Sequence, residues 1–137
     1  MALLNTFDSK TTEVTVSRLE KLNHTTAPQW GKMNSAQMLA HLNVTYDLAY
    51  DKIQPTGNFF TKFLVKILVK PIVVSEKPYK KNSHTAPIFI NNIKETEVKG
   101  AAYFEGKLSS SFGPMTSKEW SNQFYKHIDH HFDRFGV

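Results

Sequence analysis

The chain has 137 residues, a formal net charge of +5 and no cysteine. This length suits a single domain, residues 1–137, and 40% apolar with 21% charged residues is typical of a globular protein. Without cysteine there is no disulfide framework and no thiol nucleophile, so a metal site would have to use histidine, carboxylate or water. The positive charge is dispersed rather than arranged in a basic stripe, which disfavours nucleic acid as a partner. No basic region followed by an apolar run opens the chain, so we expect no signal peptide and a bacterial-type cytoplasmic location.

Two helices are expected in the first half of the chain, and the first covers residues 11–22. A period of about 100° per residue gives it an apolar inward face and a charged outward face. The inward residues are Val14, Leu19 and Leu22, and the outward residues are Arg18, Glu20 and Lys21.

The second helix begins with a capping-box pattern, in which Gln37 follows Asn34 by three residues, and continues to about Asp51. Its expected apolar face carries Met38, Leu42, Thr45 and Ala49, with His41 at the edge of that face. Asp47 and Asp51 are four residues apart on the polar side, so we expect both carboxylates to be solvated.

Residues 58–70 predict an amphipathic helix that Pro71 ends. Lys62, Lys66 and Lys70 recur every four residues, opposite Phe59, Phe63, Leu64, Ile67 and Leu68. The segment is too short and too charged to span a membrane. It can pack on the core, lie on a membrane surface or contact a partner. We expect a homodimer in which this face, with Phe60, binds its own copy and the lysines stay on the solvated rim.

The remaining elements complete a helical fold. Residues 71–87 are the expected crossover, residues 88–98 a third core helix and residues 100–106 a loop. Thr116 and Glu119 form a capping box for the final helix, which Gly136 ends. The predicted fold class is all-α, a bundle with one long connection and an extra short amphipathic helix.

The final helix carries the main functional signal. Its apolar stripe comprises Trp120, Phe124, His127, Ile128, His131, Phe132 and Phe135. His127 and His131 are four residues apart near the middle of this stripe, so both imidazoles should point inward, where their ring nitrogens need partners. A shared metal ion would satisfy both, and a chance pairing in a chain with six histidines is the alternative. Ile128 takes the place of the Glu in His-Glu-x-x-His enzymes, which argues against metalloprotease chemistry.

Several segments together resemble the DinB/YfiT-like superfamily, in one of its branches of unknown function. They are residues 30–41, 78–87, 112–120 and 125–131, with Phe135 and Gly136. The resemblance spans nearly the whole chain and implies a four-helix bundle that binds one divalent metal ion through three histidines. Carried over to this sequence, these ligands are His41, His127 and His131. One departure is the expected third helix, which is shorter here than in the family.

Three histidine ligands leave coordination positions open, the pattern of a catalytic site. The resemblance implies an enzyme acting on a small molecule, either by hydrolysis or by transfer of a low-molecular-weight thiol to an electrophile, and we expect zinc or nickel as the metal. Two alternatives remain open: a non-catalytic metal-binding or interaction bundle, and a basic protein associated with nucleic acid.

Other candidate residues are expected to support the site or to be unrelated to it. His130 is placed at the rim, and His24 and His84 in surface loops. Candidates to orient groups around the metal are Asp129, Asp133, Tyr46 and Tyr125, of which Asp129 and Tyr125 lie furthest from the stripe. Trp30 and Trp120 are expected to pack near the site without binding metal.

Overall fold

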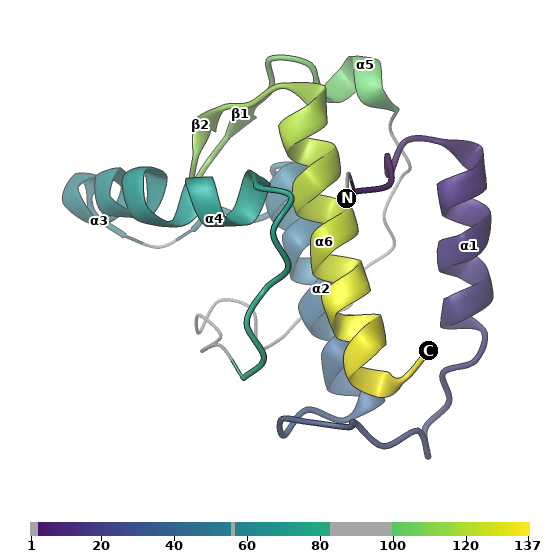
Figure 1. The fold of residues 1–137 in the computed structure, drawn as a ribbon. Coiled ribbons are helices and arrows are strands. Elements are labelled where there is room, and N and C mark those ends of the chain that lie inside the picture. Colours follow the sequence, from purple (N-terminus) through teal and green to yellow (C-terminus); the bar gives the residue numbers. More distant parts are fainter. Residues whose placement is uncertain (1–2, 56, 83–99) are drawn as a thin grey trace.

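The computed structural model describes residues 3–55, 57–82 and 100–137. The described chain is mostly helical, with one short antiparallel hairpin (Figure 1). In chain order the elements are α1 (Ser9–Leu19), α2 (Ser35–Ala49), α3 (Phe59–Leu64), the π-helical segment η1 (Val65–Val69), α4 (Lys70–Val74), α5 (Ala101–Phe104), β1 (Leu108–Ser109), β2 (Gly113–Pro114) and α6 (Ser117–Phe135). None of the described helices combines the length and the apolar character needed to cross a bilayer.

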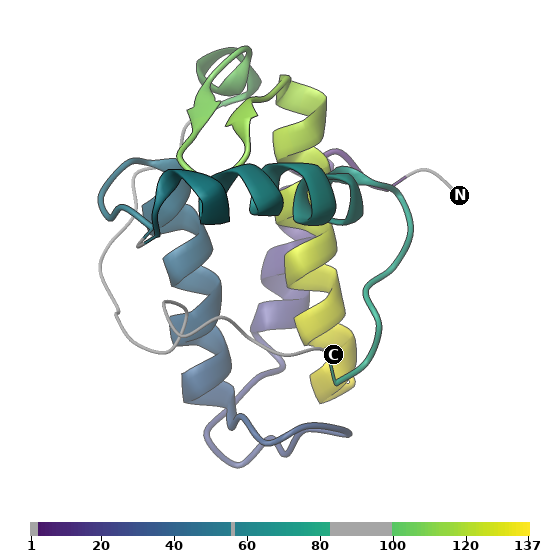
Figure 2. The ribbon, with the colours of Figure 1, turned by 90° about the vertical axis from the view of Figure 1, so that its left-hand side faces the viewer.

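The helices α2 and α6 lie side by side and run in opposite directions at the centre of the fold (Figures 1 and 2). Both begin with the predicted capping boxes: the Asn34 side chain accepts a hydrogen bond from the Gln37 amide at 2.8 Å, and the Thr116 hydroxyl accepts one from the Glu119 amide at 3.2 Å. Gly136 ends α6 with a φ of 71°, a left-handed conformation that glycine adopts without strain. These caps fix the start of each helix and therefore the angular position of the side chains that follow.

Apolar side chains from the two central helices and from α5 pack into two clusters. One contains Met38, Leu42, Phe132 and Phe135, and the other contains Ala49, Phe104, Phe112, Met115, Trp120 and Phe124. All four residues of the predicted apolar face of α2 are buried. Along α6, the histidine pair falls between Phe124 of one cluster and Phe132 of the other, so the site lies where the clusters meet.

The inward face of α1 differs from the prediction. Val14 and Leu19, predicted inward, are 44% and 39% exposed, whereas Arg18, predicted outward, is partly buried. The Arg18 guanidinium pairs with Asp129 at 2.6 Å and with Asp133 at 2.9 Å, and its Nε donates to the last carbonyl of the chain at 2.9 Å. These charge-assisted bonds hold Arg18 against α6, so α1 contacts α6 through a polar face.

The segments α3, η1 and α4 form one continuous helical arm, residues 59–74, and Pro71 does not end it as predicted. Pro71 directly follows η1, where the wider π-helical turn already interrupts the regular backbone hydrogen-bond pattern, so its missing N–H is tolerated. The arm crosses α2 and α6 in Figure 2, and in Figure 1 α3 projects beyond that pair.

The predicted loop at residues 100–106 contains α5 and leads into the β1–β2 hairpin, neither of which was expected. Phe104 of α5 is 1% exposed and belongs to the core. Two strands of two residues each leave no alternation to detect in a sequence, which explains why the hairpin was missed.

The predicted third core helix, residues 88–98, lies outside the described residues, as do residues 83–87 of the crossover. The described chain is therefore mostly α, and the four-helix topology stays a prediction.

Candidate metal centre

Three histidines from the two central helices meet at one point. His127 and His131 are one turn apart on α6, and His41 faces them from α2. Their ring centroids form a nearly equilateral triangle, with separations of 4.8, 4.6 and 4.9 Å. Ring nitrogens, one from each residue, all lie within 4.8 Å of one another. The structure thus brings together the three residues that the sequence indicated.

The separations of the ring nitrogens are compatible with a shared ion. Nε2 of His41 and Nε2 of His127 are 2.8 Å apart, a hydrogen-bond distance at which one ring donates and the other accepts. Ligands on one tetrahedral zinc ion, each about 2.1 Å from it, would be about 3.4 Å apart, so small side-chain rotations suffice. Nδ1 of His131 is buried and lacks a hydrogen-bond partner within the described part of the chain. A neutral nitrogen donor set with an unsatisfied member fits a divalent ion.

Burial keeps the two imidazoles of α6 neutral. The pKa of His127 lies well below its usual value, first because of burial and then because His131 and His41 are close. The pKa of His131 is lowered to about 3. Burial is again the first cause, and electrostatic repulsion from His41 is the second. Neutral imidazole is the form that binds metal, so the rings need not lose a proton to solvent at pH 7.

Thr45, one turn after His41 on α2, contacts the second ring nitrogen of His127. Its Oγ1 lies 2.9 Å from Nδ1 of His127, and the residue is 5% exposed. Metal-binding histidines commonly bond to a neighbouring group through the second ring nitrogen, which fixes the orientation of the ring. The sequence placed Thr45 on the apolar face without indicating this contact.

The other histidines take the predicted places where the structure describes them. His130 is partly buried, and its ring centroid lies 5.3 Å from that of His131. Burial lowers the pKa of His130 as well. His24 is exposed in a loop, and His84 lies outside the described residues.

The four side chains proposed to orient groups around a metal have other partners. Asp129 and Asp133 pair with Arg18. Tyr46 stacks on Phe124 with ring centroids 4.9 Å apart, and burial raises its pKa. Burial is also the first cause of a raised pKa for Tyr125, followed by the charge of Asp129.

Asp47 contradicts the prediction that it is solvated, because it is 2% exposed. Its Oδ1 has no hydrogen-bond partner among residues 3–55, 57–82 and 100–137. Val44, which also lies off the predicted apolar face, is 0% exposed. Hence α2 is covered on more than one side, and apolar periodicity alone underestimates its burial.

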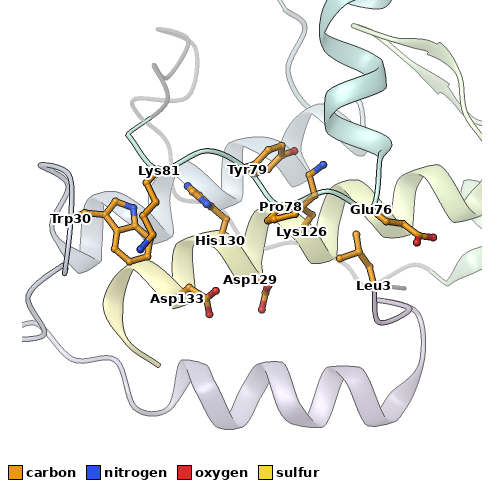
Figure 3. A pocket seen from close by; sticks show the side chains of 10 residues that line it. All are labelled: Leu3, Trp30, Glu76, Pro78, Tyr79, Lys81, Lys126, Asp129, His130 and Asp133. Atoms are coloured by element: carbon orange, nitrogen blue, oxygen red, sulfur yellow. The ribbon is translucent and has the colours of Figure 1, made fainter. Parts of the chain in front are cut away.

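A pocket of about 290 Å³ lies along the side of α6 that carries Lys126, Asp129, His130 and Asp133 (Figure 3). It is lined by Leu3, Trp30, Glu76, Pro78, Tyr79, Lys81, Lys126, Asp129, His130 and Asp133. In Figure 3, Lys81 extends toward Trp30, and the Lys81 ammonium is 4.1 Å from that ring centroid. The Tyr79 side chain lines the pocket and also lies close to the cluster. Its ring centroid is 5.6 Å from that of His130 and 6.5 Å from that of His127.

The two tryptophans contribute no ring nitrogen to the cluster. Trp120 is 2% exposed in the core, and its Nε1 donates to the Lys107 carbonyl at 3.4 Å. Trp30 forms one wall of the pocket beside His130.

Sequence reasoning missed Tyr79 and Lys126, both in the pocket wall. Lys126 is 3% exposed, and its ammonium lies 4.5 Å from the Tyr79 ring centroid and donates to the carbonyls of Ile72 and Ser75. A lysine immediately before His127, near the apolar stripe, was the only signal available for Lys126.

Comparison of the chain with models of protein families, with curated proteins and with solved structures finds no match. Function is therefore inferred from the site and from the sequence resemblance.

Proposed function

We propose that the chain is a metal-dependent enzyme of the DinB/YfiT-like type, with a divalent ion, zinc or nickel, held by His41, His127 and His131. The observation that carries the proposal is a compact set of three histidine side chains between two helices, with ring nitrogens, one from each residue, within 4.8 Å of one another. The proposed four-helix bundle would be completed by residues 88–98.

The reaction class is the one that the resemblance implies, and the donor set is compatible with it. Three protein ligands leave at least one position of a tetrahedral ion open to a small molecule. An ion in such a site polarises the group that it binds and lowers the pKa of bound water or thiol. Tyr79 and His130 lie between the cluster and the pocket, which is of a size suited to a small substrate. Hydrolysis and transfer of a low-molecular-weight thiol to an electrophile both fit this arrangement.

A non-catalytic metal-binding bundle is the second candidate. The observation that favours it is burial: His41 and His131 are each 6% exposed, as expected of ligands in a closed structural site. Retention of metal without activity toward any thiol, ester or amide substrate would support this candidate.

The two adjacent histidines of α6 provide the test of the site. Protein made without an affinity tag should contain about one metal ion per chain by elemental analysis. His131→Ala should lose the metal and any activity in a screen of thiols with electrophiles and of hydrolysable esters. His130→Ala, the matched control, should keep the metal, because its ring is outside the cluster. Equal metal loss in both variants would contradict the assignment of ligands.

A further inference from the structure

We propose that the exposed apolar face of the α3–α4 arm binds the same face of a second copy of this chain, forming a two-fold symmetric dimer. The face, called here the apolar patch, consists of Phe59, Phe60, Phe63, Leu64, Ile67, Leu68, Val69 and Ile72. Their exposed fractions are 86%, 66%, 49%, 38%, 51%, 62%, 39% and 60%, respectively. The proposal is independent of metal binding.

The arm exposes apolar side chains to solvent on the side where an ordinary surface helix carries charged ones. Lys70 turns toward the body, where its ammonium donates to the Pro114 carbonyl at 2.9 Å and lies 3.4 Å from Glu119. Lys66 passes the hairpin so closely that a Cβ on Gly113 would be 3.4 Å from its Cε and Nζ. A surface helix normally turns its charges to solvent and its apolar side inward. Here Lys66 and Lys70 reach toward the hairpin and α6 and the patch faces outward, although Lys62 and Lys66 themselves are exposed.

The size of the patch matches what a stable dimer requires. Eight side chains of Phe, Leu, Ile and Val size at these exposed fractions present on the order of 800 Å², about the area that each partner buries in an interface of standard size. A single soluble chain rarely leaves an apolar surface this large open to water.

Charge favours a second copy as the occupant. The patch itself carries no charged side chain, and the arm has no acidic residue. Binding to an anionic lipid surface would need lysines at the rim of the patch. Two of the three lysines point instead at the hairpin and α6. A neutral apolar face is complementary to itself, and a two-fold axis would bring the two patches together with both bodies outside.

Light scattering on the eluting protein at micromolar concentration tests the proposal. The wild type should have twice the chain mass of 15.7 kDa, with or without a chelator. Leu68→Lys, in the middle of the patch, should elute as a monomer with an unchanged far-ultraviolet dichroism spectrum, since position 68 is already exposed. Val16→Lys, at a 46% exposed position on α1, is the matched control and should stay dimeric.

A monomeric wild type would overturn the proposal, and so would a dimer that survives Leu68→Lys or one that Val16→Lys also disrupts. If a monomeric wild type sediments with vesicles of phosphatidylcholine and phosphatidylglycerol, the patch belongs to a lipid surface instead. Because the chain has no cysteine, oxidation of Leu68→Cys gives a second readout. It should form a covalent dimer faster than Val16→Cys.

Discussion

At the scale of single residues, the two hydrogen bonds of His127 couple its tautomer to that of His41. If Nδ1 of His127 donates to Oγ1 of Thr45, then Nε2 of His127 has a free lone pair and accepts from Nε2 of His41. In that arrangement His127 is already in the form that binds metal, whereas the proton of His41 must move to its other nitrogen. Thr45 therefore prepares one of the three ligands before any ion arrives.

Thr45→Val keeps the volume of the side chain and removes the hydroxyl. We expect the affinity for zinc to fall by about 10- to 100-fold, the usual effect of losing a group that orients a ligand. Competition with a chromophoric chelator measures this. Thr45→Ser should keep most of the affinity, and a Val variant that binds as tightly as the wild type would show that the hydroxyl does not orient His127.

The buried His131 should make the metal-free protein sensitive to acid. Its pKa is about 3 when folded, against an ordinary value of 6.5. Below pH 6.5 the unfolded chain takes up a proton at this residue and the folded chain does not, so the free energy of unfolding falls as the pH decreases toward about 3.

Urea unfolding of the metal-free protein between about pH 7 and about pH 5 measures this loss, which amounts to at most about 1.4 kcal/mol per pH unit for one group. His131→Gln should lose less free energy of unfolding than the wild type over the same interval. Parallel pH profiles would mean that His131 is protonated in both states.

At the scale of elements, the sequence predicted those features that depend only on neighbouring residues. The caps at Asn34 and Thr116 and the apolar face of α2 depend on residues within one or two turns, and the structure confirms both caps and the burial of that face. The inward side of α1 could not be predicted in this way, because the partners of Arg18 lie more than a hundred residues away. The prediction that Pro71 ends the helix was wrong for a related reason. Whether a proline breaks a helix depends on its position relative to the junction between η1 and α4, and the sequence pattern did not reveal that junction.

Lys126 anchors the end of the arm. Its ammonium donates to the carbonyls of Ile72 and Ser75 and to the Ser75 hydroxyl, at the point where α4 ends. Lys126→Met should therefore loosen α4, and amide hydrogen exchange over residues 70–75 should speed up by on the order of tenfold, since bonds to a charged donor are the stronger ones.

Lys118→Met is the control for this variant, because Lys118 belongs to the same helix and its replacement removes only a solvent-exposed ion pair with Glu76 at 3.5 Å, which contributes little. It should leave the exchange of the arm unchanged. Equal exchange in the wild type and in Lys126→Met would show that the arm is held by its apolar contacts alone.

At the scale of the whole molecule, the site joins parts of the chain that are distant in sequence. His41 and His127 are 86 positions apart, and spacing alone predicted only the pair on α6. The resemblance to a known superfamily supplied His41. Burial of Asp47 escaped both lines of reasoning, because it results from how the whole molecule covers α2.

Since the proposed ligands come from both central helices, metal should stabilise the fold as a unit. With zinc at about 100 times its dissociation constant, the gain is about 2.7 kcal/mol, and the melting temperature should rise by on the order of 10 °C. Differential scanning calorimetry with and without a chelator measures the shift. His131→Ala should show none, and a shift of equal size in that variant would place the ion elsewhere.

The π-helical segment of the arm has a geometric consequence for the apolar patch. In a plain α-helix each step of four residues overshoots a full turn by about 40°, so Phe60, Leu64, Leu68 and Ile72 would wind through about 120° around the axis. A wider turn at Val65–Val69 takes up part of that overshoot. The four side chains then form a straighter row, and Lys62, Lys66 and Lys70 form a second row on another side. A plain α-helical turn of the same length at Val65–Val69 would restore the winding, and the four side chains would then no longer share one flat face.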